Sequence, residues 1–181
     1  MISRYFSGFC LRGEEGLFGQ YSAQGDFCVR GFSLGAQRAF EYAYEMVVKE
    51  GRRVDTLQLF SPAFFGGKDE KFKRMQLMFF KKDDQQYRDN FFANCIYPNE
   101  ADASFLDPYK SEGSYEELHE LLYYEWDAKR VQELQSAGVK IEVYLGERDK
   151  IVDSSDAKEF FLPYGTLYFI KNAGHILKRK S

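Results

Sequence analysis

Several residue types are scarce in this sequence, and each scarcity excludes a class of protein. Three cysteines cannot all pair with one another, and their wide spacing fits no zinc site when only two histidines are present. The 25 basic residues are outnumbered by 28 acidic ones, whereas nucleic-acid-binding proteins normally carry a basic surface. No apolar run approaches the roughly 20 residues of a membrane-spanning helix. We therefore expect no metal site, no nucleic-acid partner and no membrane span.

The residues that are present predict one globular domain. The chain has 181 residues, 44% apolar and 29% charged, which is ordinary for a folded protein. A chain of this length can bury roughly 70% of its unfolded surface. The first residues, 1–6, have no signal-peptide core, which predicts a cytoplasmic protein. Because no glycine-rich phosphate loop or dinucleotide fingerprint occurs, we also expect no cofactor.

Short apolar runs alternate with helical patterns, which predicts a parallel sheet with helical crossovers. Five strands are expected, at residues 2–6, 26–30, 54–60, 139–145 and 166–170. A stripe of apolar residues with helical spacing predicts a helix from Ser33 to a stop at Gly51. Polar and apolar residues alternate in the fourth strand, so one of its faces is expected to be partly uncovered.

Strand signals disappear between residues 62 and 135. Helical patterns take their place, at residues 68–82, 84–94 and 114–126. The last of these begins with the capping-box residues Ser114 and Glu117. A helical insertion in an α/β frame is expected to cover the carboxyl edge of the sheet, where ligands bind. We therefore predict a single compact α/β domain over residues 1–181, with a core of 1–61 and 136–181 and a helical lid of 62–135.

The segment Gly31-Phe32-Ser33-Leu34-Gly35 fits the pattern Gly-x-Ser-x-Gly. It follows a predicted strand and opens a predicted helix, which is the setting of a nucleophile elbow. The two glycines are needed because the turn is sharp and other backbone approaches closely. Ser33 is thus the expected nucleophile, at a helix N-terminus whose dipole favours an oxyanion. The alternative is a glycine-flanked turn with an N-cap serine.

A serine hydroxyl needs a general base, and the chain offers two imidazoles. His175 lies in a loop after the last predicted strand, where α/β hydrolases carry their base, whereas His119 lies within a predicted helix. Asp149 follows the fourth predicted strand and is the expected acid. Asp153, four residues later, remains an alternative acid. The chain order of nucleophile, acid and base is that of α/β hydrolases, which predicts a compact α/β-hydrolase fold with about five mainly parallel strands and a helical lid.

Two backbone N–H groups are expected to form the oxyanion hole. One is that of Leu34, directly after the nucleophile, and the other is that of Phe9, in the loop after the first strand. Loss of one such donor typically lowers turnover by about 100- to 1000-fold. Cys10 and Cys28 are expected to be small core residues.

One segment is basic although the chain as a whole is acidic. Its cations are Lys68, Lys71, Lys73, Arg74, Lys81 and Lys82. Its apolar residues Phe72, Met75 and Phe79 have helical spacing and predict an apolar face. Two interpretations remain open: a solvated amphipathic helix, or a landing surface for an acidic partner above an acyl tunnel. A landing surface would raise association rates and make them sensitive to salt.

Several longer segments resemble one family. They are Phe6-Ser7-Gly8-Phe9, the Gly-x-Ser-x-Gly segment leading into Glu41-Tyr42-Ala43-Tyr44, Leu59-Phe60-Ser61-Pro62, Phe72-Lys73-Arg74-Met75-Gln76-Leu77, Glu112-Gly113-Ser114-Tyr115-Glu116-Glu117-Leu118 and Gly138-Val139-Lys140-Ile141-Glu142-Val143. Together with His175 they make the chain similar to the BioV type of pimeloyl-[acyl-carrier protein] methyl ester esterase, an α/β hydrolase of bacterial biotin synthesis. One residue departs from the pattern, because Ser7 stands where many relatives have histidine before the glycine.

The resemblance implies a serine carboxylesterase that releases methanol from the methyl ester of pimeloyl-[acyl-carrier protein]. Its partner would be acyl carrier protein bearing a phosphopantetheine-linked acyl methyl ester. Ser33 would be the nucleophile, His175 the base and Asp149 the acid. Two alternatives stay open: a general carboxylesterase or acyl thioesterase on the same scaffold, and a hydrolase-like binding module with an idle site.

Overall fold

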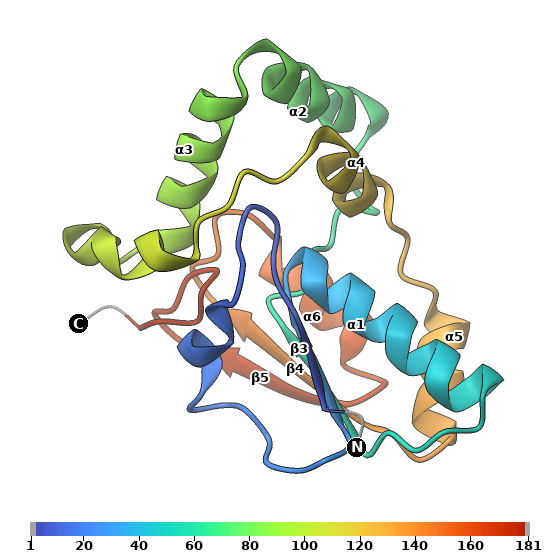
Figure 1. The fold of residues 1–181 in the computed structure, drawn as a ribbon. Coiled ribbons are helices and arrows are strands. Elements are labelled where there is room, and N and C mark those ends of the chain that lie inside the picture. The colour runs from blue at the N-terminus through green and yellow to red at the C-terminus, as the bar shows by residue number, and fades with distance from the viewer. Residues whose placement is uncertain (1–2, 180–181) are drawn as a thin grey trace.

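The computed structural model describes residues 3–179, and five parallel strands form its centre (Figure 1). Their order in the sheet is their order in the sequence: β1 (Arg4–Phe6), β2 (Cys28–Phe32), β3 (Thr56–Phe60), β4 (Lys140–Gly146) and β5 (Thr166–Ile170). The expectation of an α/β fold with five parallel strands is confirmed for this part of the chain. Among these residues, no helix is both long and apolar enough to cross a membrane.

One face of the sheet is covered by helices that connect the strands. Helix α1 (Leu34–Tyr44) packs against β1, β2 and β3, and α6 (Ser154–Phe161) packs against β4 and β5. A π-helical turn, η2 (Glu45–Lys49), extends α1. The chain then turns at Gly51, whose φ of +64° is unfavourable for residues with a side chain. The expected helix from Ser33 to Gly51 therefore forms, with its last turn widened.

The opposite face is covered by the connection from β1 to β2, which contains the 3-10 helix η1 (Glu14–Phe18). The expectation that one face of the fourth strand is partly uncovered is wrong, because Glu142 and Tyr144 are each only 5% exposed. Gln58 donates to the Glu142 carboxylate and to the Tyr21 carbonyl, so that the polar side chains of this face are paired beneath residue 21. Polar alternation here marks a buried hydrogen-bonded cluster.

The connection from β3 to β4 contains most of the remaining helices. They are α2 (Glu70–Lys82), α3 (Asp84–Ile96), η3 (Glu100–Tyr109), α4 (Tyr115–Tyr123) and α5 (Ala128–Ser136). We call α2, α3, η3 and α4 the cap helices, because Figure 1 shows them together beyond one end of the sheet. Helix α5 lies apart from them and packs against α1 and η2.

Helix α4 begins with the expected capping box, in which Ser114 and Glu117 each accept the other's backbone N–H. It ends at Tyr123, three residues before the expected end at Trp126. The indole of Trp126 donates to the Ala63 carbonyl and packs against Phe40 and Phe161. Because these tertiary contacts hold the tryptophan against the core, the chain leaves the helix before reaching it.

Candidate active site

Ser33 lies at a sharp turn between β2 and α1. Its φ of 55° and ψ of −115° are a strained conformation for a residue with a side chain. The flanking glycines are sterically required, since a Cβ on Gly31 would lie 2.0 Å from the Gly35 carbonyl oxygen. A Cβ on Gly35 would lie 2.0 Å from the Phe6 carbonyl oxygen. The Ser33 side chain makes no helix-capping hydrogen bond, so the turn is not explained by an N-cap serine.

His175 and Asp149 meet in the interior, and both side chains are fully buried. The Nδ1 atom of His175 lies 2.6 Å from Oδ2 of Asp149. The other carboxylate oxygen of Asp149 accepts the backbone N–H groups of Ile151 and Val152, which fixes its orientation after β4. A carboxylate at Nδ1 stabilises the tautomer in which Nε2 accepts a proton. The pair therefore has the form of an oriented general base.

Asp153, the alternative acid, has a different task in the structure. Its Oδ1 accepts the backbone N–H groups of Ser155 and Asp156 at the start of α6. It is thus the N-cap of that helix, which satisfies amides that would otherwise lack partners. His119 is exposed on α4 and stacks on Tyr123, at a ring separation of 4.4 Å. Of the two acids and two imidazoles considered, the structure brings together Asp149 and His175.

Two close contacts hold the loop of His175, one with the residue after β3 and one with the residue after α3. The Ser61 hydroxyl donates to the His175 carbonyl at 2.6 Å. A Cβ on Gly174 would lie 1.8 Å from the Tyr97 carbonyl oxygen, so this position accepts only glycine. Ser61 was not predicted from the sequence, although a polar residue directly after a parallel strand is a general signal for the ligand-binding edge of the sheet.

Ser33 and His175 lie in one buried cluster. The Phe32 ring packs 4.9 Å from the His175 ring, and the Ser33 carbonyl accepts the N–H of Ala63, next to the Ser61 turn. The Ser33 Oγ and the His175 Nε2 are both buried, and neither has a hydrogen-bond partner within residues 3–179. No hydrogen bond joins them in this structure.

The two expected oxyanion donors lie on neighbouring segments. Leu34 is the first residue of α1, where a backbone N–H has no partner inside the helix. Phe9 lies in the loop after β1, which contacts the start of α1 where Phe6 meets Gly35. The Phe9 ring packs against Phe80 of α2 and Phe91 of α3, at ring separations of 6.2 and 5.3 Å. The loop is thus fixed between the core and the cap helices.

A cavity of about 580 Å³ lies between the cap helices and the core. Its apolar lining includes Phe9, Phe72, Phe79, Leu118, Leu122 and Ile151. Phe9 and Ile151 belong to the loops that follow β1 and β4, so the cavity borders the loop of Asp149, although Ser33, Asp149 and His175 do not themselves line it. Of the three apolar residues that the sequence analysis places on this helix face, Phe72 and Phe79 line the cavity. Met75 is 37% exposed and does not line it.

The basic residues of α2 and the segment before it are not equivalent. Lys73 is only 8% exposed and lies over the Tyr123 ring, because positions 73, 77 and 80 form the buried face of α2. Lys82 lines the cavity. Arg74 pairs with Glu70 on the surface. The remaining basic side chains are exposed: Lys68, Lys71 and Lys81. Lys73 is therefore absent from any exposed basic patch.

Comparisons with known proteins define the fold. No protein-family model and no curated protein matches the sequence. The structure is similar to BioG from Haemophilus influenzae, with a TM-score of 0.60 and 13% identity over 96% of this chain and 88% of that one. It is also similar to a carboxylesterase from Nitrososphaera gargenis (TM-score 0.56, 17% identity, 83% of this chain) and to naproxen esterase from Bacillus subtilis (0.53, 20%, 83%).

These likenesses establish an α/β fold shared with hydrolases. The chain spans 58% of the length of the first esterase and 53% of the second.

Proposed function

We propose that the protein is a serine carboxylic-ester hydrolase that works through an acyl-enzyme. The observation that carries this proposal is the fully buried His175–Asp149 pair, at 2.6 Å, packed beside a strained serine elbow. Burying ionisable groups costs free energy unless they are paired and hydrogen-bonded, and a strained serine turn between a strand and a helix is the setting of a nucleophile elbow. The fold likeness to two esterases supports the same reaction class.

The proposed reaction has two steps that share one base. Ser33 Oγ attacks the ester carbonyl while His175 Nε2 takes its proton, and the Phe9 and Leu34 amides stabilise the oxyanion. His175 returns the proton to the departing alkoxide, which leaves as an alcohol. Water then gives a proton to His175 and attacks the acyl-enzyme, and Ser33 leaves with that proton as the free carboxylate forms.

The proposed substrate is the methyl ester of a pimeloyl chain carried by acyl carrier protein. Support comes from the resemblance to the BioV type of esterase and from the fold likeness to BioG. The apolar cavity beside Phe9 suits an acyl chain, and the exposed cations of the basic segment suit an acidic carrier. A carrier docked outside would let only the far end of the chain reach Ser33, which favours the methyl ester over the thioester.

The products formed from carrier-bound substrate show whether Ser33 reaches the methyl ester or the thioester. We expect methanol to be released while the acyl chain stays on the carrier, measured by methanol detection and by the mass of the carrier. Free carrier thiol in place of methanol would show an acyl thioesterase instead. Equal turnover of free and carrier-bound methyl esters would indicate a general carboxylesterase.

Charge reversal on α2 is expected to weaken carrier binding specifically. Lys71→Glu combined with Arg74→Glu should raise KM for the carrier-bound ester about tenfold and leave a small soluble ester unaffected, because rim charges mainly steer association. The effect should shrink at high salt. Both side chains are exposed, so the fold should not change.

A matched control is the pair Lys49→Glu and Lys129→Glu. Like Arg74, each of these lysines pairs with a glutamate one helical turn away, but they lie on η2 and α5, apart from the cap helices. If the control raises KM as much, or if the α2 variant loses activity on both substrates, the basic residues of α2 are not a carrier-docking surface.

A further inference from the structure

A buried carboxylate that takes no part in the reaction above lies beside the loop of Phe9. Glu14, the first residue of η1, is 0% exposed. Its Oε1 accepts the backbone N–H of Gly8 at 2.7 Å and the hydroxyl of Tyr5 at 2.9 Å. Its Oε2 is buried and has no hydrogen-bond partner within the described residues. This acid thus concentrates both of its hydrogen bonds on one oxygen.

Stability alone does not explain why a carboxylate is buried in this arrangement. A buried carboxylate with unsatisfied hydrogen-bonding capacity is destabilising, whereas a bond from a backbone N–H to a carboxylate is short and strong. Burial, together with the neighbouring Glu14, holds the pKa of Tyr5 well above its ordinary value. The Tyr5 hydroxyl therefore remains protonated and donates to Glu14, which fixes the carboxylate that in turn fixes Gly8.

Gly8 is held on both of its polar groups: its carbonyl accepts the Leu11 N–H at 3.2 Å, and its own N–H donates to Glu14 at 2.7 Å. A Cβ at this position would lie 2.7 Å from the Phe32 ring, so glycine is required, and glycine is the residue with the most backbone freedom. The orientation of Phe9 N–H depends directly on the backbone angles of Gly8. The bond from Gly8 N–H to Glu14 therefore restricts the backbone angles that orient the Phe9 N–H, together with the bond that the Gly8 carbonyl accepts from Leu11.

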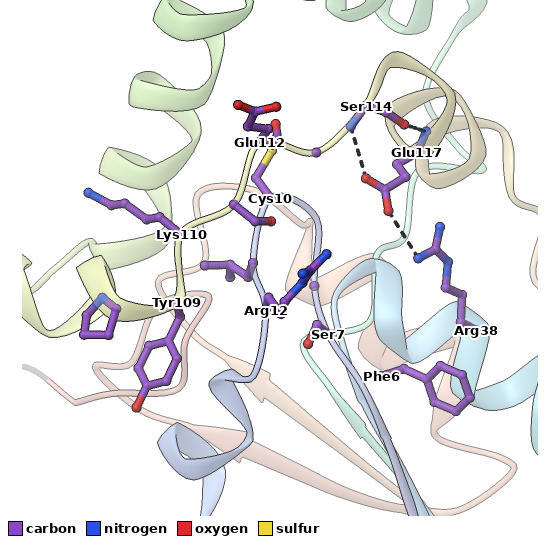
Figure 2. Close-up of a pocket in the computed structure, with 15 residues that line it drawn as sticks. Phe6, Ser7, Cys10, Arg12, Arg38, Tyr109, Lys110, Glu112, Ser114 and Glu117 are labelled. Carbon is purple, nitrogen blue, oxygen red and sulfur yellow. Dashed lines mark hydrogen bonds and ion pairs between the residues drawn. The ribbon is translucent and has the colours of Figure 1, made fainter.

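The outer side of the same loop does not supply this control. It borders a cavity of about 890 Å³ lined by Ser7, Cys10, Arg12, Lys110 and Glu112, among others (Figure 2). Its outer contacts are backbone bonds to the β3–β4 connection, from Arg12 N–H to the Tyr109 carbonyl and from Ser111 N–H to the Cys10 carbonyl. They hold residues 10–12, beyond the Gly8–Phe9 peptide. Glu14 holds Gly8 itself, from within the core.

We propose that Glu14 is a positioning residue for ester hydrolysis: by accepting the Gly8 N–H, it aims the Phe9 N–H at the oxyanion. The inference rests on the proposed function. The hydrogen bond is what matters, because a negative charge near the oxyanion would oppose catalysis. A glutamine side chain can offer its carbonyl oxygen at the same place without the charge. Glutamine at position 14 should therefore retain ester hydrolysis, whereas alanine should lower it.

The test compares Glu14→Ala with Glu14→Gln on a soluble methyl ester, with rates expressed per serine titrated by a fluorophosphonate. For Glu14→Ala we expect kcat to fall about 10- to 100-fold with KM within twofold, since a misaimed donor should cost less than the roughly 100- to 1000-fold of a lost one. Affinity for a trifluoromethyl ketone, whose adduct carries the oxyanion, should fall by the same factor as kcat/KM. Glu14→Gln should stay within threefold of the wild type.

Three results would overturn the inference: an unchanged kcat in Glu14→Ala, equal losses in both variants, or a rise in KM at constant kcat. If Glu14→Ala does not fold, Glu14→Asp takes its place, because the shorter side chain withdraws the carboxylate from Gly8. An unchanged kcat in Glu14→Asp would overturn the inference as well. A wild-type protein that hydrolyses no ester would refute the proposed function and this inference together, whereas an active wild type with an insensitive Glu14 refutes only the inference.

Discussion

Replacement of Ser33 by alanine is expected to lower kcat for ester hydrolysis by about 10⁵-fold or more and to abolish labelling by a fluorophosphonate. Loss of a serine nucleophile in comparable hydrolases costs on the order of 10⁶-fold, because attack, acyl-enzyme formation and the use of the base all fail together. The measurements are methanol release from a methyl ester and the mass of the labelled protein. Near-normal turnover in the variant would refute Ser33 as the nucleophile.

The same substitution should leave the fold intact. The Ser33 hydroxyl is buried without a hydrogen-bond partner among the described residues, and removal of such a group is neutral or slightly stabilising. Alanine bears the same backbone strain as serine at this φ. Urea unfolding should give an unchanged or slightly higher midpoint. Ser136→Ala, on an exposed position of α5, is the matched control and should keep full activity and labelling.

Labelling of the wild-type protein also separates an enzyme from a binding module with an idle site. An activated serine reacts with a fluorophosphonate, whereas an ordinary serine does not. If the wild type is not labelled, the buried His175–Asp149 pair is a structural feature of the interior and the proposed function is wrong.

Local signals in the sequence were sufficient to predict the strands of the sheet and the turn at Ser33. Strand β2 and helix α1 differ in apolar spacing, and the change falls at Ser33 between two glycines. Such a turn is determined by residues close in sequence, so its conformation could be predicted. The positions of Asp149 and His175 followed from another local rule, namely that ligand-binding residues of parallel sheets follow the strand ends.

Properties that depend on contacts between distant segments could not be predicted. Lys73 was placed with the exposed cations, but the packing of α2 on α4 buries it over Tyr123. One face of β4 was expected to be only partly covered, but residues 18–23 cover the polar side chains of that face and supply hydrogen-bond partners. Hydropathy and charge do not reveal whether a polar residue has found a buried partner.

Glu14 is the clearest case of this limit. In the sequence it is one of two adjacent glutamates in a short glycine-bounded segment, and nothing distinguishes it from Glu15. In the structure Glu14 is fully buried, whereas Glu15 pairs with Arg30 and its side chain is 44% exposed. The difference arises from the 3-10 turn of η1, which directs one residue inward and the next outward. A sequence pattern cannot fix that direction within so short a helix.

Replacement of Asp149 by asparagine is expected to lower kcat by about 10⁴-fold, the second largest effect among these variants. The asparagine carbonyl can still accept the N–H groups of Ile151 and Val152, so the loop after β4 should keep its shape. Its amide group would then donate to His175 Nδ1. That bond forces the proton of the neutral imidazole onto Nε2, where it can no longer accept the proton of Ser33.

Asp153→Asn is the matched control for this prediction, because it makes the same chemical change four residues away. Asp153 caps α6, and asparagine is as good an N-cap as aspartate, so activity and stability should both remain close to wild type. Activity is measured as methanol release per titrated serine, and folding by urea unfolding. If Asp153→Asn lost as much activity as Asp149→Asn, orientation of His175 by one carboxylate would not explain the site. If Asp149→Asn kept its activity, the 2.6 Å contact between Asp149 and His175 would have no catalytic consequence.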